Sequence, residues 1–556
     1  MKAKISRRKF NTIFTAGTLG LVSGCRFFNQ FDVIIKNGTI VDGSGNSAVK
    51  QDLGIIGEKI AAIGDLKNAT ASTVIDATDH VLSPGFIDIH THTDMELLVN
   101  PTADSKIMQG VTTEVSGNCG SSPFPLNETD FTEMDSRIFE KYGFHVSWRD
   151  TAGFLRALED KRVAMNYATF TGHGDLRSFA VGKNDVPATS AQLKKMQEIL
   201  ARSMAEGSFG LSTGLEYAPG SYASTAELVE LNKIVARHNG VYATHMRSED
   251  VLLEEAVQEA LQICEEAQVS LQISHLKACN QANWHKIDGV LETIERAAES
   301  GVPVKADRYP YIAYGTGLSA FLPLWSRQGT TEEILARLLD KTESVKIEAY
   351  TESRGKNIGG WDRVVISSCN SQENKVWEGK SILTSAGEQG KTCFQFIRDI
   401  LVEEKNQVGI VGFAMDENNL KKVLASPSVM VGSDGNAVAP TGKLGVGKPH
   451  PRFYGAFPRV LGKYAREDKI FDLATAVKKM TSMPADKLGL KQRGLIAKDY
   501  FADIVVFNPE TVIDKATFAD PHQFAAGIEH VLVNGKLTVR DGKHTKALAG
   551  SVLRHS

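Results

Sequence analysis

The chain is 556 residues long, with 42% hydrophobic residues and a formal net charge of −3. This length is too great for one ordinary domain and predicts a barrel-sized unit with a smaller one. The near-neutral charge gives no indication of a nucleic-acid partner. Beyond the N-terminal segment, no apolar run has the length needed to cross a bilayer.

The first 25 residues have the features of a bacterial export signal. A basic start precedes a short apolar segment, which is too short to span a membrane. The sequence "SRRKF" resembles a twin-arginine signal, and "VSGC" resembles a lipobox in which Cys25 would become the lipidated first residue. The alternative is a basic tail with a chance cysteine. We expect an exported lipoprotein of the bacterial cell envelope, held at a membrane only by this anchor.

Two β-rich segments, residues 26–84 and 491–556, lie at opposite ends of the mature chain. Each has an alternation of apolar residues interrupted by Asn-Gly, at Asn37-Gly38 and Asn534-Gly535, which is typical of a hairpin turn. Two separate edge hairpins are one interpretation. We favour one small β-sandwich assembled from both ends, with the rest of the chain inserted between them.

Residues 85–490 repeat an apolar strand, a polar or Gly-rich tip and an amphipathic stretch. Eight such units predict an α/β fold, a (β/α)₈ barrel of the TIM type. The gap from Asp307 to Asp434 is too long for one helix and its return, so we expect an inserted, lid-like subdomain at roughly 313–365. The eight tips are "FIDIHTH", "TTEVSGNCG", "YATFTGHG", "FGLSTGLEY", "VYATHMR", "LQISHLK", "VKADRYPY" and "VMVGSDG".

The stretch "GFIDIHTHTD" places two histidines at the end of the first predicted barrel strand. Residues i and i+2 of a strand point the same way, so His90 and His92 project together, at the end of the barrel where active sites lie. Two imidazoles on one face suit a metal ion, although solvent-exposed or core histidines are the alternative. Other tips supply further ligand types at the same level: Cys119 after the second strand, His245 at the fifth, His275 at the sixth and Asp434 at the eighth.

The cysteines are consistent with a metal site. Removing Cys25 leaves an odd number, so in an exported protein at least one is expected to be unpaired or metal-bound. The absence of any CxxC pair argues against a structural zinc finger. The five that remain are Cys119, Cys264, Cys279, Cys369 and Cys393.

The motifs together resemble the N-acyl-D-amino-acid deacylases, or D-aminoacylases, of the amidohydrolase superfamily. HxH alone indicates only the superfamily. "GNCG" is more specific, because many relatives bridge two metals with a carboxylated lysine, whereas this group has a cysteine after strand two. The resemblance runs over about residues 31–545 through "GFIDIHTHTD", "GVTTEVSGNCGSSPFPL", "TGHGDLR", "GLSTGLEYAPGSYAS", "YATHMRSED", "ISHLKA", "YPYIAYGTGL", "VGSDG" and "HPRFYGAFPRVLG".

This resemblance implies a zinc enzyme with two metal positions. The side chains of Cys119, His245 and His275 resemble the tight zinc site of the family. A Cys/His₂ set with an open fourth place is typical of catalytic rather than structural zinc. We expect one tightly bound Zn²⁺; whether a second position fills stays open. That weaker position, which Cys119 could bridge, would be formed by His90, His92 and Asp434.

The expected reaction is hydrolysis of an N-acyl-D-amino acid to a carboxylate and a free D-amino acid. Zinc lowers the pKa of bound water to about 7 and polarises a carbonyl. Asp434 is the best candidate for the general base, which takes a proton from water and gives it to the leaving amine. The alternative is a turn or cap aspartate in "SDG".

The resemblance also implies substrate-binding residues. Lys277 and Tyr309 match the family's pair that holds the α-carboxylate, with a solvated lysine and a packed tyrosine as the alternative. Tyr217 matches a group near the acyl chain. Arg247 is a candidate for contacting the substrate side chain, with a surface salt bridge as its alternative. Two further candidates of that kind are Glu249 and Arg452, whereas His173 is not expected to be a ligand.

Two other functions stay open. A D-aminoacyl dipeptidase or a cyclic-amide hydrolase could use the same site, although the missing bridging lysine argues against the cyclic-amide group. An exported, non-catalytic binding protein belongs to another class, and the complete set of six candidate ligands argues against it. The sequence does not indicate the preferred D-amino acid, the acyl group or the oligomeric state.

Overall fold

The computed structural model describes residues 30–555, so the predicted export signal and Cys25 lie outside the described part. Its centre is a closed barrel of parallel strands that pair in chain order. A parallel bridge between Thr91 and Gly435 joins the last strand to the first. The predicted (β/α)₈ barrel is therefore confirmed. Its strands are β8 (Phe86–Asp88), β9 (Val111–Ser116), β10 (Asn166–Thr169) with its continuation β11 (Thr171–Gly172), β12 (Gly210–Gly214), β13 (Val241–His245), β14 (Ser270–Ile273), β15 (Val304–Arg308) and β19 (Val429–Val431).

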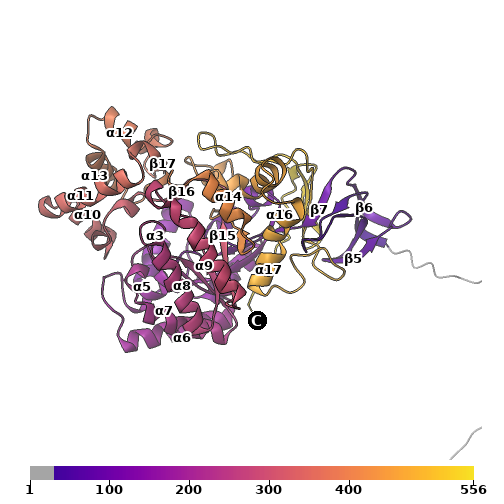
Figure 1. The fold of residues 1–556 in the computed structure, drawn as a ribbon, viewed down its shortest axis with the longest axis horizontal. Coiled ribbons are helices and arrows are strands. Elements are labelled where there is room, and N and C mark those ends of the chain that lie inside the picture. The colour runs from indigo at the N-terminus through magenta and orange to yellow at the C-terminus, as the bar shows by residue number, and fades with distance from the viewer. Residues whose placement is uncertain (1–29, 556) are drawn as a thin grey trace, which may run out of the picture.

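Helices cover the outside of the barrel and bury their apolar faces on it. In α7 (Thr225–Arg237), Leu228, Leu231 and Val235 recur at helical spacing and are buried, while the Ser224 side chain caps the first turn. Neighbouring helices from α5 to α9 contact one another along one side of the barrel (Figure 1). The layer also contains α3 (Glu128–Tyr142), α4 (Thr151–Lys161), α5 (His173–Ala180), α6 (Ser190–Glu206), α8 (Leu253–Ala267), α9 (Ile287–Glu299), α14 (Glu417–Ala425), α16 (Leu473–Met480) and α17 (Ser482–Leu488).

The two ends of the chain form one β-sandwich, as predicted. Strands β7 (Val81–Pro84) and β20 (Ile504–Phe507) pair antiparallel, which places the early and late segments in one sheet. Side chains of both sheets, among them Ile35, Leu53 and Leu82, pack into a common core. One sheet has the order β5 (Lys59–Gly64), β4 (Asp52–Ile56), β1 (Gln30–Lys36), β6 (Thr70–Asp76); the other has β23 (Lys543–His544), β22 (Lys536–Arg540), β21 (Ile528–Val533), β20, β7, β2 (Thr39–Ile40), β3 (Val49–Lys50).

Only one of the two Asn-Gly pairs makes the predicted hairpin. Asn534-Gly535 joins β21 to β22, and Val533 pairs with Lys536. At Asn37-Gly38 the prediction is wrong, because β1 pairs with β4 and β6 whereas β2 pairs with β3 and β7. A turn sequence specifies a local bend but not the partner of the next strand, and here the chain crosses from one sheet to the other.

The inserted subdomain is larger than the predicted 313–365. It is built on a small antiparallel sheet whose central strand, β18 (Gly409–Gly412), lies between β16 (Tyr314–Gly317) and β17 (Val364–Ser368). Local patterns do not reveal that β18, far along the chain, completes this sheet. The subdomain lies on the opposite side of the barrel from the sandwich (Figure 1). Its helices are α10 (Thr331–Leu339), α11 (Lys341–Asn357), α12 (Ile382–Glu388) and α13 (Cys393–Glu403). Among the described helices, none is long and apolar enough to cross a membrane.

Candidate metal centre and active site

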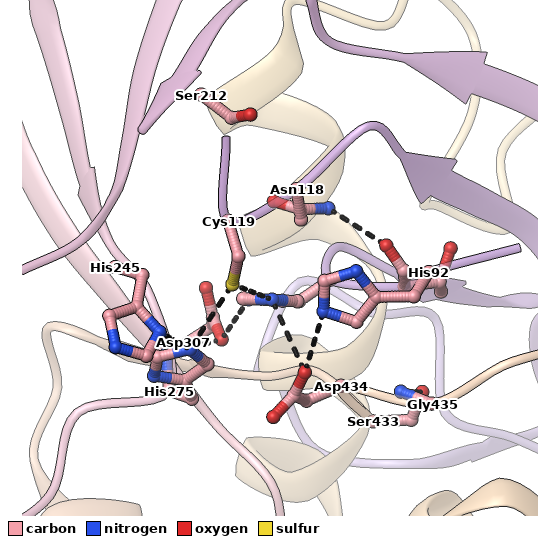
Figure 2. Close-up of polar contacts among 12 residues, drawn as sticks. His92, Asn118, Cys119, Ser212, His245, His275, Asp307, Ser433, Asp434 and Gly435 are labelled. Carbon is pink, nitrogen blue, oxygen red and sulfur yellow. Dashed lines mark hydrogen bonds and ion pairs between the residues drawn. The ribbon is translucent and has the colours of Figure 1, made fainter. Parts of the chain in front are cut away.

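The six predicted ligands come together at the carboxyl end of the barrel strands (Figure 2). They come from the ends of five different barrel strands, so the closed sheet brings the cluster together. His245 is the last residue of β13, and the others lie in the loops just beyond their strands. Those others are His90 and His92 after β8, Cys119 after β9, His275 after β14 and Asp434 after β19.

The Cys119 thiol lies at the centre of this cluster. Its Sγ is 3.3 Å from Nε2 of His275 and 3.4 Å from Nε2 of His90. On one side, Nδ1 of His245 is 3.0 Å from Nε2 of His275. On the other side, Oδ1 of Asp434 is 3.0 Å from Nε2 of His92 and 3.6 Å from Nε2 of His90.

Three of these ligands have a left-handed backbone, which is unfavourable for residues other than glycine. The φ angles are 51° at Cys119, 35° at His275 and 52° at Asp434. Each such residue costs about 1–3 kcal/mol and persists only where the surrounding structure holds it. The strain at three strand tips therefore indicates a geometry that is maintained for the site.

The glycines of "GNCG" and "STG" allow Cys119 to reach the centre. A Cβ on Gly120, where φ is 77°, would lie 2.6 Å from the backbone nitrogen of Gly214, and a Cβ on Gly214 would lie 2.1 Å from the Cys119 carbonyl oxygen. No side chain fits at such distances. The loop after β9 thus packs directly on the end of β12.

Two buried carboxylates orient the imidazoles. Oδ1 of Asp307 lies 3.0 Å from Nδ1 of His90 and accepts a hydrogen bond of 2.8 Å from the backbone N–H of His275. Oε1 of Glu249 lies 2.8 Å from Nδ1 of His275. Each carboxylate holds the Nδ1 side of a ring and turns Nε2 towards Cys119, an arrangement that is common around metal ions. The role of Asp307 was not predicted from the sequence, although this residue lies in β15, within the seventh strand tip.

The charges of the cluster favour ionised donors. Burial raises the pKa of the Cys119 thiol, but His275 and His90 outweigh burial and bring this pKa well below its usual range. Burial likewise opposes ionisation of Asp434, but the Arg452 guanidinium, 2.8 Å from its Oδ2, and His92 hold the carboxyl pKa well below its usual range. Arg452 begins helix α15 (Arg452–Arg459).

These residues fit a zinc ion. Ligands about 2.0–2.3 Å from a tetrahedral zinc ion lie roughly 3.5 Å from one another, close to the contacts of the Cys119 sulfur. The donor atoms of His90, Cys119, His275 and Asp434 lie within 4.8 Å of one another, and those of His245, Glu249 and His275 do as well. A thiol, imidazoles and a carboxylate form the donor set that Zn²⁺ prefers.

Two of the predicted carboxylate-binding residues lie beside the cluster. The Lys277 ammonium is buried, forms an ion pair with Glu249 and lies 2.8 Å from Nδ1 of His275. Tyr309 is also buried, and its hydroxyl has no hydrogen-bond partner among the described side chains and backbone groups. The Arg452 guanidinium lies 4.7 Å from the centre of the Tyr309 ring. Lys277, Tyr309 and Arg452 therefore form a wall of hydrogen-bond donors next to the ligands, in which each cation faces a carboxylate.

Tyr217 adjoins the cluster, whereas Arg247 does not reach it. The Tyr217 ring is 4.8 Å from the His245 ring, and its hydroxyl lies 3.5 Å from Thr316 of the inserted subdomain. The Arg247 guanidinium is instead bound at 2.9 Å by Glu259 and by backbone carbonyls. Its contact with the substrate stays a prediction, and all its nitrogens already have partners among the described residues. His173 pairs with the buried Glu227 and is not among the grouped ligands, as expected.

Comparison with known proteins identifies the class. The sequence pattern of the amidohydrolase family matches residues 73–539. The chain is 37% identical to the D-aminoacylase of Alcaligenes xylosoxydans xylosoxydans, over 94% of this chain and 97% of that protein. A solved structure of N-acyl-D-glutamate deacylase from Bordetella bronchiseptica, complexed with zinc and a phosphonate mimic of the tetrahedral intermediate, is 32% identical, with a TM-score of 0.80 over 94% of this chain and 100% of that one. A structure from work on the binuclear metal centre of D-aminoacylase is 36% identical, with a TM-score of 0.79 over the same shares.

The barrel and its cluster of ligand side chains, together with metal-bound relatives, define a metal-binding hydrolase that acts on amide bonds. The chain belongs to the D-aminoacylase family of the amidohydrolase superfamily, and the resemblance predicted from its motifs is confirmed.

Proposed function

We propose that the protein is a zinc-dependent deacylase that hydrolyses N-acyl-D-amino acids to a carboxylate and a free D-amino acid. The observation that carries the proposal is the position of Cys119, whose sulfur contacts imidazoles from both halves of the six-residue cluster. The similarity to D-aminoacylase and to N-acyl-D-glutamate deacylase supports the same substrate class.

The six proposed ligands form two groups, one for each metal position. Cys119, His245 and His275 would hold the tight zinc, and a second, weaker position would be formed by His90, His92 and Asp434. Bound there, zinc would supply Lewis-acid polarisation of the acyl carbonyl and would lower the pKa of water. Asp307 and Glu249 fix which ring nitrogen of His90 and His275 faces the metal.

Asp434 is the proposed proton carrier. Its carboxylate accepts the proton that water loses as the water oxygen bonds to the acyl carbon. The same proton then passes to the amide nitrogen as the carbon–nitrogen bond breaks, which gives a carboxylic acid and an amine. The proton of the acid then moves to the amine, so that the final products are a carboxylate and an ammonium group without any further reactant. Arg452 and His92 hold the pKa of Asp434 well below its usual range, so this carboxylate is ionised before reaction and has an oxygen that can accept the proton.

The wall of donors formed by Lys277, Tyr309 and Arg452 is the proposed site for the substrate's α-carboxylate. The Tyr309 hydroxyl has no hydrogen-bond partner among the described residues, and the cations of Arg452 and Lys277 lie beside its ring, where each also faces a carboxylate. Charge-assisted contacts of this kind are stronger than neutral hydrogen bonds. Fixing the α-carboxylate on one side of the metal ligands would let only one enantiomer place its acyl group over them.

A screen of acetylated D- and L-amino acids with the purified protein tests this proposal. We expect release of free amino acid from D substrates, with little from the L series, together with about one tightly bound zinc per chain. Hydrolysis confined to L substrates, or a protein without metal, would contradict it. The same screen across D side chains identifies the preferred substrate.

A further inference from the structure

We infer that Lys106, a residue with no assigned role, is a positioning residue that fixes Asp434 relative to the first barrel strand. Lys106 lies on the short helix α2 (Asp104–Ile107) and its side chain is fully buried. It does not contact any proposed metal ligand directly. The predicted effect on turnover rests on the proposed function, whereas the predicted position of Asp434 does not.

The Lys106 ammonium uses its three protons to join two segments of the site. It donates to Oδ2 of Asp88 at 2.7 Å, to Oγ of Ser433 at 2.6 Å and to the carbonyl oxygen of Gly435 at 3.1 Å. Asp88 precedes His90 by two residues, and Ser433 and Gly435 are the two neighbours of Asp434 (Figure 2).

Asp88 completes this connection from the other side. Its Oδ1 accepts a hydrogen bond of 2.8 Å from the backbone N–H of Ser433, while Oγ of Ser433 accepts one of 3.1 Å from the N–H of Gly435. The exposed fraction of Asp88 is 0%, so the pair is shielded from water and its geometry is well defined.

The backbone of Asp434 explains why such a connection is needed. Asp434 is left-handed, with a φ of 52°, and its N–H donates to the His90 carbonyl at 2.8 Å. A strained residue of this kind keeps its conformation only if its neighbours are held. Lys106 holds the neighbour on each side, and thereby sets the distance from the Asp434 carboxylate to His92.

A second buried lysine provides a matched control. Lys479 donates to the carbonyls of Ser426 and Val429, at the opposite end of the same strand β19, and is also nearly fully buried. Replacing it by Met removes a buried amino group and its bonds to the backbone without touching the active-site end. Lys479→Met therefore reports what the loss of a buried lysine does to folding alone.

The test uses the full-length enzyme with Lys106→Met combined with Asp88→Asn, so that no unpaired carboxylate stays buried. Crystal structures of wild type and of this double variant should show the Asp434 carboxylate displaced from His92, with Cys119, His245 and His275 in place. The kcat for an acetylated D-amino acid should fall about 10- to 100-fold, with little change in KM or in tight zinc. Ser433→Ala, which keeps the ion pair, should show a smaller fall in kcat, and Lys479→Met should show none.

An unmoved Asp434 in the double variant, or a wild-type kcat in both that variant and Ser433→Ala, would overturn the inference. If the double variant does not fold, Ser433→Ala decides alone, since a wild-type kcat there contradicts the positioning role. A wild-type enzyme without any D-substrate turnover would refute the proposed function instead, and the crystallographic comparison would still decide the position of Asp434.

Discussion

Asp434 combines three properties at one residue: a strained backbone, ionic contacts on both carboxylate oxygens and a proposed role in proton transfer. Oδ1 faces His90 and His92, and Oδ2 faces Arg452. An aspartate that served only as a turn or cap residue would not need a buried guanidinium beside it. The alternative interpretation of "SDG" as simple turn chemistry therefore does not explain these contacts.

Asp434→Asn should separate proton transfer from metal binding. Asparagine keeps the shape of the side chain and removes its basicity, so kcat should fall by a factor of about 10² to 10⁴. KM should change little, and the tight zinc should remain. Steady-state kinetics and metal analysis check both points. Asp503→Asn is the control, because Asp503 is also buried and paired with an arginine, but in the sandwich. Near-normal turnover by Asp434→Asn would show that another group carries the proton.

Cys119→Ala should release most of the zinc. The Cys119 sulfur contacts the Nε2 atoms of both His90 and His275, and its low pKa favours the thiolate, which is the form that binds a metal ion. Cys264→Ala is the matched control, since Cys264 is buried between α8 and β14, away from the ligands, and its pKa is raised to about 11 by burial. Zinc content is measured after gel filtration. Equal zinc in wild type and Cys119→Ala would remove the thiol from the site.

At the scale of elements, the inserted subdomain and the barrel meet at the active-site end. Arg354 of α11 pairs with Asp250 at 2.6 Å, and Asp250 follows Glu249, which contacts both Lys277 and His275. The pair connects the subdomain to the loop that carries Glu249, the partner of Lys277.

Asp250→Asn should loosen this loop and raise KM. The pair is partly exposed, so its loss is expected to cost about 1 kcal/mol, or roughly a fivefold rise in KM, with the tight zinc unchanged. Asp399→Asn is the control, because Asp399 pairs with Lys391 within the subdomain and away from the barrel. An unchanged KM in Asp250→Asn, measured beside that control, would show that this contact does not support substrate binding.

The elements differ in how far they could be predicted from sequence. All eight barrel strands were found because each has a short apolar run and a polar tip, and the closed order of such units is nearly unique. The limits of the inserted subdomain were not found, because the pairing of β18 with β16 and β17 depends on residues far apart in the chain. Asp307 was present in a tip but gave no signal of its own, since one carboxylate at a strand end has many uses.

The substrate-binding residues show the same limit. The ligand types of the metal cluster are rare at strand tips and could be recognised in sequence. Arg247 was predicted to contact substrate, but its partner Glu259 lies on helix α8 and could be paired with it only through the fold. Charged side chains near a site are common, and the sequence does not show which of them already have partners.

At the scale of the whole molecule, a buried lysine at the opposite end of the barrel makes stability depend on pH. Burial lowers the pKa of Lys479 from 10.5 to about 7, and no carboxylate of the described residues pairs with it. At a pH between these two pKa values, Lys479 is protonated in the unfolded chain and unprotonated in the folded protein. The contribution of Lys479 to the free energy of unfolding therefore rises as the pH increases from about 7 to about 10.5.

Lys479→Met should flatten this dependence. One proton contributes a slope of at most about 1.4 kcal/mol per pH unit, and the variant should lose that part of the slope between pH 7 and pH 10. Denaturant unfolding of wild type and variant at several pH values measures it. The same slope in both proteins would show that Lys479 keeps an ordinary pKa in the folded state.

The most direct test of the central claim is a zinc titration of the metal-free enzyme, followed by hydrolysis of an N-acetyl-D-amino acid that the wild-type protein accepts. The account predicts that the metal-free protein is inactive and that the rate reaches its maximum near one equivalent of zinc, because Cys119, His245 and His275 are proposed to form one tight site. Activity without metal, or zinc binding that restores no hydrolysis of the D substrate, would contradict it.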